Sequence, residues 1–512
     1  MLYLCASNVE SFMSPFQTRI AVILFCCFVP FFLEAQSFIY LDQSPFPKVR
    51  NLILSFEFDS AKSLVSKTEK DPKREAVRLF YLSQLDAWNF VLTENEKLYE
   101  SYLVSNDLAH ESVENFEDEA EFSFLNGELH FWKTLIGFRK GETISPVWNG
   151  NKAFAAYEKA DRLDPKNPDI LKGIGLAHFM VGIVPKNFKW ITSVFGFSGT
   201  MSQGLSELEF SAKNGKYGKT DAQFFLAAIK LLVDREGGES FKMLQVLIKQ
   251  YPKNGIYILT ACLALQRDRQ VEAAAELCRE KLDYFKTKLP AFSDLIELRL
   301  GECQFLLNDF KTSEKTFLSF LDGYGGKSLK PIAYYRLAIS QEMNGKHEEA
   351  KRNFERIEPR TGFEFEIYAK AESEKYLSRP MSLIEKQIWI ARNTFDCGKF
   401  SEAIGQFNSI LGKQIKDDEL AAEIYYRLGR AYEEAKQTDK AMECYEKAKR
   451  YQVKLNNWVC SFSLFQQGKI LAKSGKKSEA AVKFTEAYNM DGHAFENSLS
   501  REIDTELKKL EQ

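Results

Sequence analysis

Small side chains stand at an uneven spacing in a stretch near the C-terminus, residues 425–451. If a unit is numbered from Ala422, position 8 is Gly429, and positions 20 and 27 are alanines. Positions 4, 7, 8 and 11 share one face of a first helix, and positions 20, 24 and 27 share one face of a second. Because small side chains allow two backbones to approach closely, this order predicts two antiparallel helices packed as a hairpin.

The same order recurs along much of the chain. It is clear in the units that begin at Pro331, Ile384 and Ser461, and weaker in those that begin at Asp221, Asn254 and Asp294. One helix pair cannot bury its apolar face alone, whereas a series of stacked pairs builds a continuous core. The recurrence therefore predicts an elongated array of helical hairpins.

The residues at these positions resemble the tetratricopeptide repeat family, which has a large residue at position 4, Leu-Gly at 7 and 8, Ala at 20, Phe or Tyr at 24 and Ala at 27. The resemblance covers about residues 120–488. It implies an all-α fold, a tetratricopeptide-type α-solenoid in which stacked helical hairpins form a right-handed superhelix. The expected parts are a divergent helical region (37–120), an N-terminal array (121–290), a C-terminal array (291–490) and a capping helix (491–512).

The first 36 residues differ from the rest of the chain in composition. Arg19 precedes an apolar run over residues 20–33, and the small residue Ala35 follows. This order is typical of a secretory signal peptide, which predicts cleavage near Ala35–Ser37 and export to the periplasm or the exterior. The run is short for a membrane span, which needs about 20 residues, but an uncleaved N-terminal anchor remains the alternative.

An insertion at residues 184–203 interrupts one unit. Its apolar rings are Phe188, Trp190, Phe195 and Phe197. The order of a proline, an aromatic helix, G-F-S-G and a G-L-x-x-L helix resembles a eukaryotic tetratricopeptide family that includes the yeast inclusion-body clearance protein, over about residues 120–260. That resemblance implies an interaction scaffold. The rings either cap the core of their own unit or form a lip that contacts a partner or lipid.

The sequence offers little for catalysis, metals or nucleic acid. The chain has five histidines, and none stands at a metal-binding spacing, so we expect no metal and no cofactor. Residues 323–328, GYGGKS, suggest a phosphate-binding loop, but Leu321 replaces its first glycine and the stretch is better explained as a loop between helices. Lys and Arg (69) nearly balance Asp and Glu (71), so no basic field would attract nucleic acid.

Six cysteines lie beyond the first 36 residues, and none forms a C-x-x-C pair. The simplest interpretation is that they are small apolar residues on helix faces. Cys262 and Cys278 are the first pair to test for a disulfide, because they lie on consecutive expected helices.

The resemblance also implies a binding surface, because positions 2, 5, 9 and 12 of each first helix line the concave groove of a tetratricopeptide array. Position 9 is basic in three consecutive units, and position 5 is aromatic in most. The predicted groove residues are Tyr335, Arg392, Phe395, Tyr426, Arg430, Phe465 and Lys469. Cations beside rings would suit an extended peptide with acidic groups or a C-terminal carboxylate. A solvated groove without a ligand is the alternative.

These observations predict a non-catalytic, exported tetratricopeptide protein that binds peptide or protein partners through its concave face, as a scaffold or assembly factor in the cell envelope. One alternative is a superhelical hydrolase of cell-wall polymers that uses a buried glutamate as its acid. The other is a membrane-associated adaptor, although membrane contact is not expected.

Overall fold

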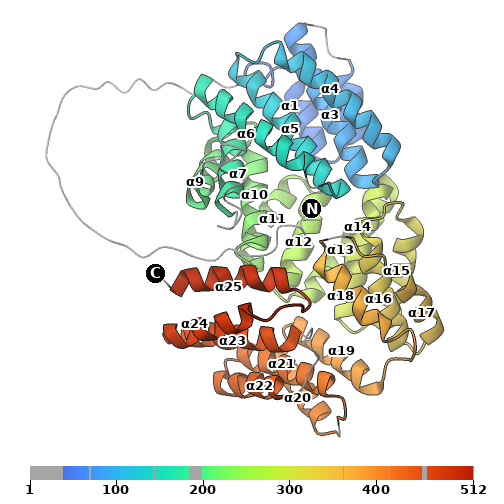
Figure 1. Ribbon diagram of the computed structural model, residues 1–512. Coiled ribbons are helices and arrows are strands. Elements are labelled where there is room, and N and C mark those ends of the chain that lie inside the picture. Colours follow the sequence, from blue (N-terminus) through green and yellow to red (C-terminus); the bar gives the residue numbers. More distant parts are fainter. Residues whose placement is uncertain are drawn as a thin grey trace, which may run out of the picture. The chain divides into compact units, whose positions relative to one another are not determined.

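The structure is a computed structural model that describes residues 38–67, 71–142, 144–183, 199–360, 362–413, 415–451 and 458–510. In these ranges the chain forms 24 helices and no strands, which confirms the expected all-α solenoid (Figure 1). The contacts divide the chain into two compact units. Unit 1 comprises the described residues up to Asp234 together with Lys242–Tyr257, and unit 2 comprises Arg235–Phe241 together with the described residues from Ile258 onward. The expected boundary between arrays at residues 290 and 291 stays a prediction.

Unit 1 is a series of antiparallel helices in which each packs mainly against the next along the chain. Its helices are α1 (Phe46–Leu54), α2 (Phe58–Val65), α3 (Pro72–Thr93), α4 (Glu96–Glu114), α5 (Ala120–Lys140), α6 (Ser145–Leu163), α7 (Pro168–Ile183), α9 (Met201–Asn214) and α10 (Lys219–Leu232). Helices α11 (Gly237–Gln250) and α12 (Gly255–Arg267) each have residues in both units.

Unit 2 continues the same pattern of consecutive hairpins. Its helices are α13 (Val271–Lys288), α14 (Pro290–Leu306), α15 (Phe310–Gly323), α16 (Lys330–Met343), α17 (His347–Glu355), α18 (Glu364–Glu374), α19 (Leu383–Asp396), α20 (Phe400–Leu411), α21 (Asp418–Glu434), α22 (Thr438–Arg450), α23 (Trp458–Lys473), α24 (Lys477–Tyr488) and α25 (Glu496–Leu510). Residues 324–329 connect α15 to α16, so the GYGGKS stretch lies largely in a loop between helices, as expected.

The small residues lie where the two helices of a hairpin approach most closely. A Cβ atom added at Gly429 would come within 2.7 Å of the Tyr445 ring, and one added at Gly468 would come within 2.5 Å of Phe484. These distances are shorter than van der Waals contact, so only glycine fits opposite the ring. Position 8 therefore receives the ring at position 24, which confirms the packing that the spacing predicted.

The turn inside each hairpin has a left-handed residue at one position. Gly345, Gly398 and Gly475 have φ values of 79°, 76° and 77°, and Lys436 takes the same place with φ 60°. The backbone amide that follows this residue donates a hydrogen bond to a carbonyl of the first helix, as Gln437 N does to Tyr432 O at 2.8 Å. Such a turn satisfies the carbonyl groups left unpaired at the end of a helix.

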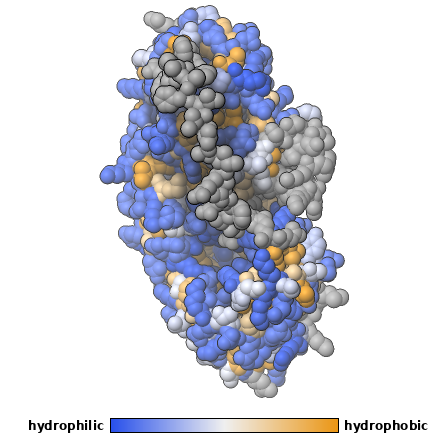
Figure 2. All heavy atoms as spheres, turned by 90° about the vertical axis from the view of Figure 1, so that its left-hand side faces the viewer, coloured by the Kyte–Doolittle hydropathy of each residue, from blue (hydrophilic) through white to orange (hydrophobic). Residues whose placement is uncertain are grey.

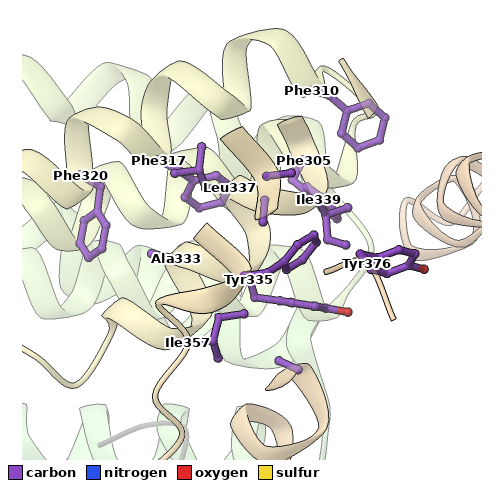
Figure 3. Close-up of a cluster of buried hydrophobic side chains, with 14 of the residues drawn as sticks. Phe305, Phe310, Phe317, Phe320, Ala333, Tyr335, Leu337, Ile339, Ile357 and Tyr376 are labelled. Atoms are coloured by element: carbon purple, nitrogen blue, oxygen red, sulfur yellow. The ribbon is translucent and has the colours of Figure 1, made fainter. Parts of the chain in front are cut away.

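A core of aromatic and aliphatic side chains fills the space between successive hairpins. In unit 2 one cluster joins α14, α15, α16 and the residues after α18, and Figure 3 shows Tyr335 beside Leu337, Ile339 and Tyr376. Hydrophilic residues predominate on the face shown in Figure 2, where hydrophobic residues form scattered patches. Burial between hairpins, summed over neighbouring pairs, thus stabilises the array.

The cysteines behave mainly as packing residues. Five of the six are buried, and Cys460 is half-buried. The Sγ atoms of Cys262 and Cys278 lie 3.2 Å apart as free thiols, so the two cysteines are neighbours in the structure. Whether they form a disulfide stays a prediction.

Candidate functional site

The three basic residues predicted for the groove lie at position 9 of consecutive first helices in unit 2. Arg392 is on α19, Arg430 on α21 and Lys469 on α23, and α21 contacts both of the other helices. We call the surface formed by positions 2, 5, 9 and 12 of α19, α21 and α23 the groove face of unit 2. The helical register places the three cations on this one face.

Arg392 shares its carboxylate partner with a second guanidinium group. Its Nη1 lies 3.6 Å from Glu423 Oε1, and Arg427 Nε lies 2.6 Å from the same oxygen. The guanidinium of Arg392 also stacks on Trp389, 3.9 Å from the ring centroid. Burial alone would raise the pKa of Glu423, but Arg427, Arg392 and Lys375 lower it to about 2. Glu423 therefore carries its negative charge at any physiological pH.

Arg430 has only distant carboxylate partners. Its Nε is 3.8 Å from Glu433 and its Nη2 is 3.7 Å from Glu434, both beyond hydrogen-bond distance. Glu434 also lies 3.5 Å from Arg269 Nη2, so it too is shared between two guanidinium groups. Glu433 accepts a hydrogen bond from the Tyr445 hydroxyl at 2.8 Å. Among the described residues, the buried Nε of Arg430 has no hydrogen-bond partner.

Lys469 is the third cation of the column. Burial, together with the nearby cations Arg430 and Lys473, lowers the pKa of Lys469, while Glu433 and Glu502 act in the opposite direction. Its Nζ lies 5.6 Å from the centroid of the Phe465 ring. Within the described part of the chain, no ion pair of 4 Å or less involves Lys469.

The predicted aromatic residues of the groove differ from one another in how exposed they are. The structure places three of the rings in the core, with exposed fractions of 1% for Tyr335, 5% for Tyr426 and 2% for Phe465. Each packs against rings of its own or the next hairpin, such as Phe354 for Tyr335 and Trp458 for Tyr426. Whether these buried rings take part in binding stays a prediction.

Phe395, at position 12 of its unit, is only partly buried. The guanidinium of Arg269 lies over its ring, 4.4 Å from the centroid, and Arg269 Nη1 donates to Phe395 O at 3.0 Å. These two residues are 126 positions apart in the chain. The turn between α12 and α13 thus borders the groove face and adds a further cation to it.

Sequence reasoning missed the residues that set the charge of this face. Glu423 stands at position 2 of its unit, so the repeat register alone could have identified it. Arg427 and Lys375 occupy no groove position, and Arg269 comes from a remote turn. Arg427 follows Glu423 by four residues on α21, a spacing that the sequence shows, whereas only the packing of the chain places Lys375 and Arg269 near these carboxylates.

The predicted lip, Phe188, Trp190, Phe195 and Phe197, lies outside the described residues, as do residues 1–36. Across the ranges that the structure describes, no cluster of three or more His, Cys, Asp or Glu side chains could hold a metal ion. No helix in those ranges has the length and hydropathy needed to cross a membrane.

Comparison with known proteins identifies the repeats. The family described as Iml2/Tetratricopeptide repeat protein 39 matches residues 169–360, and the family described as Tetratricopeptide repeat matches residues 422–452. Both resemblances stated from the sequence are thereby confirmed. No curated protein matches the chain.

Among solved structures, the chain is similar to one from the APC/C hetero-tetramer Cut9–Hcn1, with 14% identity, a TM-score of 0.28 and coverage of 92% of this chain and 98% of that one. It is also similar to the human IFIT1 dimer with m7Gppp-AAAA, with 14% identity, a TM-score of 0.29 and coverage of 93% and 95%. The P58(IPK) TPR domain has 14% identity and a TM-score of 0.22, with coverage of 75% and 97%.

Proposed function

We propose that this chain, a tetratricopeptide-repeat protein, is a non-catalytic scaffold whose unit 2 binds an acidic segment of a partner protein. The premise is the family match, in which residues 169–360 are of the Iml2/Tetratricopeptide repeat protein 39 type. Tetratricopeptide arrays bind protein partners along an extended surface built from successive repeats. The proposed contact surface is the groove face of unit 2.

The observation that carries the proposal is the sharing of carboxylates. Glu423 lies near Arg392 and Arg427, and Glu434 lies near Arg430 and Arg269. Two guanidinium groups thus share Glu423, and Arg430 has Glu433 and Glu434 only at 3.8 and 3.7 Å, beyond hydrogen-bond distance. A carboxylate of a ligand would supply the close partner that Arg430 lacks, through charge-assisted hydrogen bonds.

The Glu423 carboxylate is not suited to be the catalytic acid of a hydrolase. A catalytic acid needs a raised pKa so that it holds a proton near neutral pH. Glu423, a half-buried glutamate of the groove face, has its pKa lowered to about 2, because the nearby cations outweigh burial. It is therefore suited to orient arginines and unsuited to donate a proton.

Our test compares two charge reversals that change the net charge equally. The groove variant carries Arg430→Glu with Lys469→Glu. The control carries Lys447→Glu with Lys483→Glu on the second helices α22 and α24, where each lysine lies within 4 Å of a glutamate of its own helix. Binding of labelled acidic peptides, with free and with amidated C-termini, is measured by fluorescence anisotropy, and circular dichroism checks that each variant is folded.

We expect the wild type and the control to bind the acidic peptides and the groove variant to lose binding. A free C-terminus that binds more tightly than the amide would identify a terminal carboxylate as the preferred group. Equal binding by the groove variant and the control, with both folded, would refute the proposed site.

We also propose that the protein is exported and acts in the cell envelope, on the basis of the leader pattern in residues 1–36. Mass spectrometry of the protein extracted from its native cells measures the N-terminus. We expect it near Ser37, and an intact Met1 or Met13 would rule out cleavage. The membrane-associated alternative would then rest on an uncleaved leader.

A further inference from the structure

Residues 38–57 lie across the first helices of unit 1 and contact parts of the chain that are remote in sequence. The first half of this N-terminal segment is non-helical and meets α5: Phe38 stacks on Phe124 with ring centroids 5.0 Å apart. The backbone amides of Tyr40 and Leu41 donate to the Glu121 carboxylate at 3.0 and 2.5 Å. A groove carboxylate is thus satisfied by the backbone of a segment about 80 residues away in the chain.

The contacted residues of α5 occupy groove positions. A Cβ atom at Gly127 would come within 2.6 Å of the Tyr157 ring, just as one at Gly429 would meet Tyr445, so Gly127 takes the place of position 8. Glu121 and Phe124 then correspond to positions 2 and 5. The N-terminal segment therefore lies where a tetratricopeptide array would hold a ligand.

The second half of the segment is α1, and it is held by charge. Arg50 Nη2 donates to Asp221 Oδ2 on α10 at 3.0 Å, and its guanidinium stacks on Tyr217 at 3.8 Å from the ring centroid. At the end of α1, Asn254 Nδ2 donates to Leu54 O at 2.8 Å, across 200 residues. The face that receives this segment offers both signs of charge, because Lys216 Nζ also donates to Asp42 at 2.6 Å and Lys253 Nζ donates to Glu57 at 3.0 Å.

We propose that this face of unit 1 is a second peptide-binding site, occupied in cis by the chain's own residues 38–57, and that the same segment supplied in trans can take its place. The contacts are those by which an array holds a separate peptide: a ring, backbone amides on a carboxylate, and one guanidinium group inserted beside a second carboxylate. The occupant to which the site is matched is an aromatic stretch that forms turns, followed by a helix that carries an arginine.

The experiment starts from the folded full chain. A protease recognition sequence is inserted after Lys67, which is exposed and follows α2, so that cleavage leaves the N-terminal segment bound without a covalent link. A labelled synthetic peptide of residues 38–67 is then added, and exchange is followed by anisotropy while circular dichroism reports the helical content. We expect the labelled peptide to exchange into the site with no loss of helical signal.

Two peptide variants test the specificity of the exchange. Arg50→Ala removes the guanidinium that meets Asp221, and we expect it to weaken binding by about tenfold or more. Lys48→Ala removes a cation two residues earlier, where the side chain is exposed on α1, and it should leave binding unchanged. Exchange only when helical signal is lost, or equal binding of the two variants, would overturn the proposal and make residues 38–57 an integral part of the core.

Discussion

Gly429 offers a direct test of the close approach on which the array depends. Replacing glycine by alanine inside a helix normally stabilises the folded state by about 1 kcal/mol, because glycine loses more backbone entropy. At Gly429 the new Cβ atom would lie 2.7 Å from the Tyr445 ring. That ring is fully buried and its hydroxyl is bonded to Glu433 at 2.8 Å, so it has little room to move.

Overpacking a well-filled site costs about 1–3 kcal/mol. The helical gain and the overpacking cost oppose each other. We therefore expect Gly429→Ala to leave the stability of the α21–α22 hairpin unchanged or to lower it by up to about 2 kcal/mol. Gly405→Ala is the matched control, because Gly405 lies within α20 and an added Cβ atom would meet nothing within 4 Å. There we expect only the gain of about 1 kcal/mol.

Hydrogen exchange read by mass spectrometry measures the free energy of local opening in each hairpin, which suits an array whose repeats can open separately. The double variant Gly429→Ala with Tyr445→Leu should be more stable than Tyr445→Leu alone. The smaller leucine side chain makes room for the new methyl group, which then fills part of the space that the ring occupied. If Gly429→Ala stabilised its hairpin as much as Gly405→Ala does, close approach of the helices would not be the reason for glycine at position 8.

Two further predictions concern unit 1 and the hairpin turns. Burial lowers the pKa of His110 to about 4 and that of His130 to about 3, so both are neutral in the folded state at pH 5 while the unfolded chain binds protons below about pH 6.5. The free energy of unfolding should therefore fall as the pH drops from 7 to 5, by about 2 kcal/mol for each histidine. Urea unfolding at the two pH values measures this loss, which should be smaller in the His110→Gln, His130→Gln double variant than in the wild type. Lys436→Gly should stabilise the α21–α22 hairpin by about 1 kcal/mol in the same exchange assay, because lysine is strained at φ 60°, and no gain there would contradict the assigned turn.

The repeat architecture could be predicted from the sequence because its signal is local. Gly429, Tyr445 and Ala448 fall within one hairpin, and their spacing follows from the helical period and the length of one turn. The basic column is predictable for the same reason, since Arg392, Arg430 and Lys469 occupy the same place in successive units. Features that recur at the same position of every repeat can therefore be predicted from the sequence alone.

Only the tertiary structure decided which of the groove residues remain accessible and how their charges are matched. Tyr335 and Tyr426 are buried because rings of neighbouring hairpins close over them, and the repeat position does not reveal that. The sharing of Glu434 with Arg269 and the docking of Arg50 on Asp221 join residues 165 and 171 positions apart. Such contacts depend on how far each hairpin rotates on the next, a sum of small packing angles that no short stretch of sequence encodes.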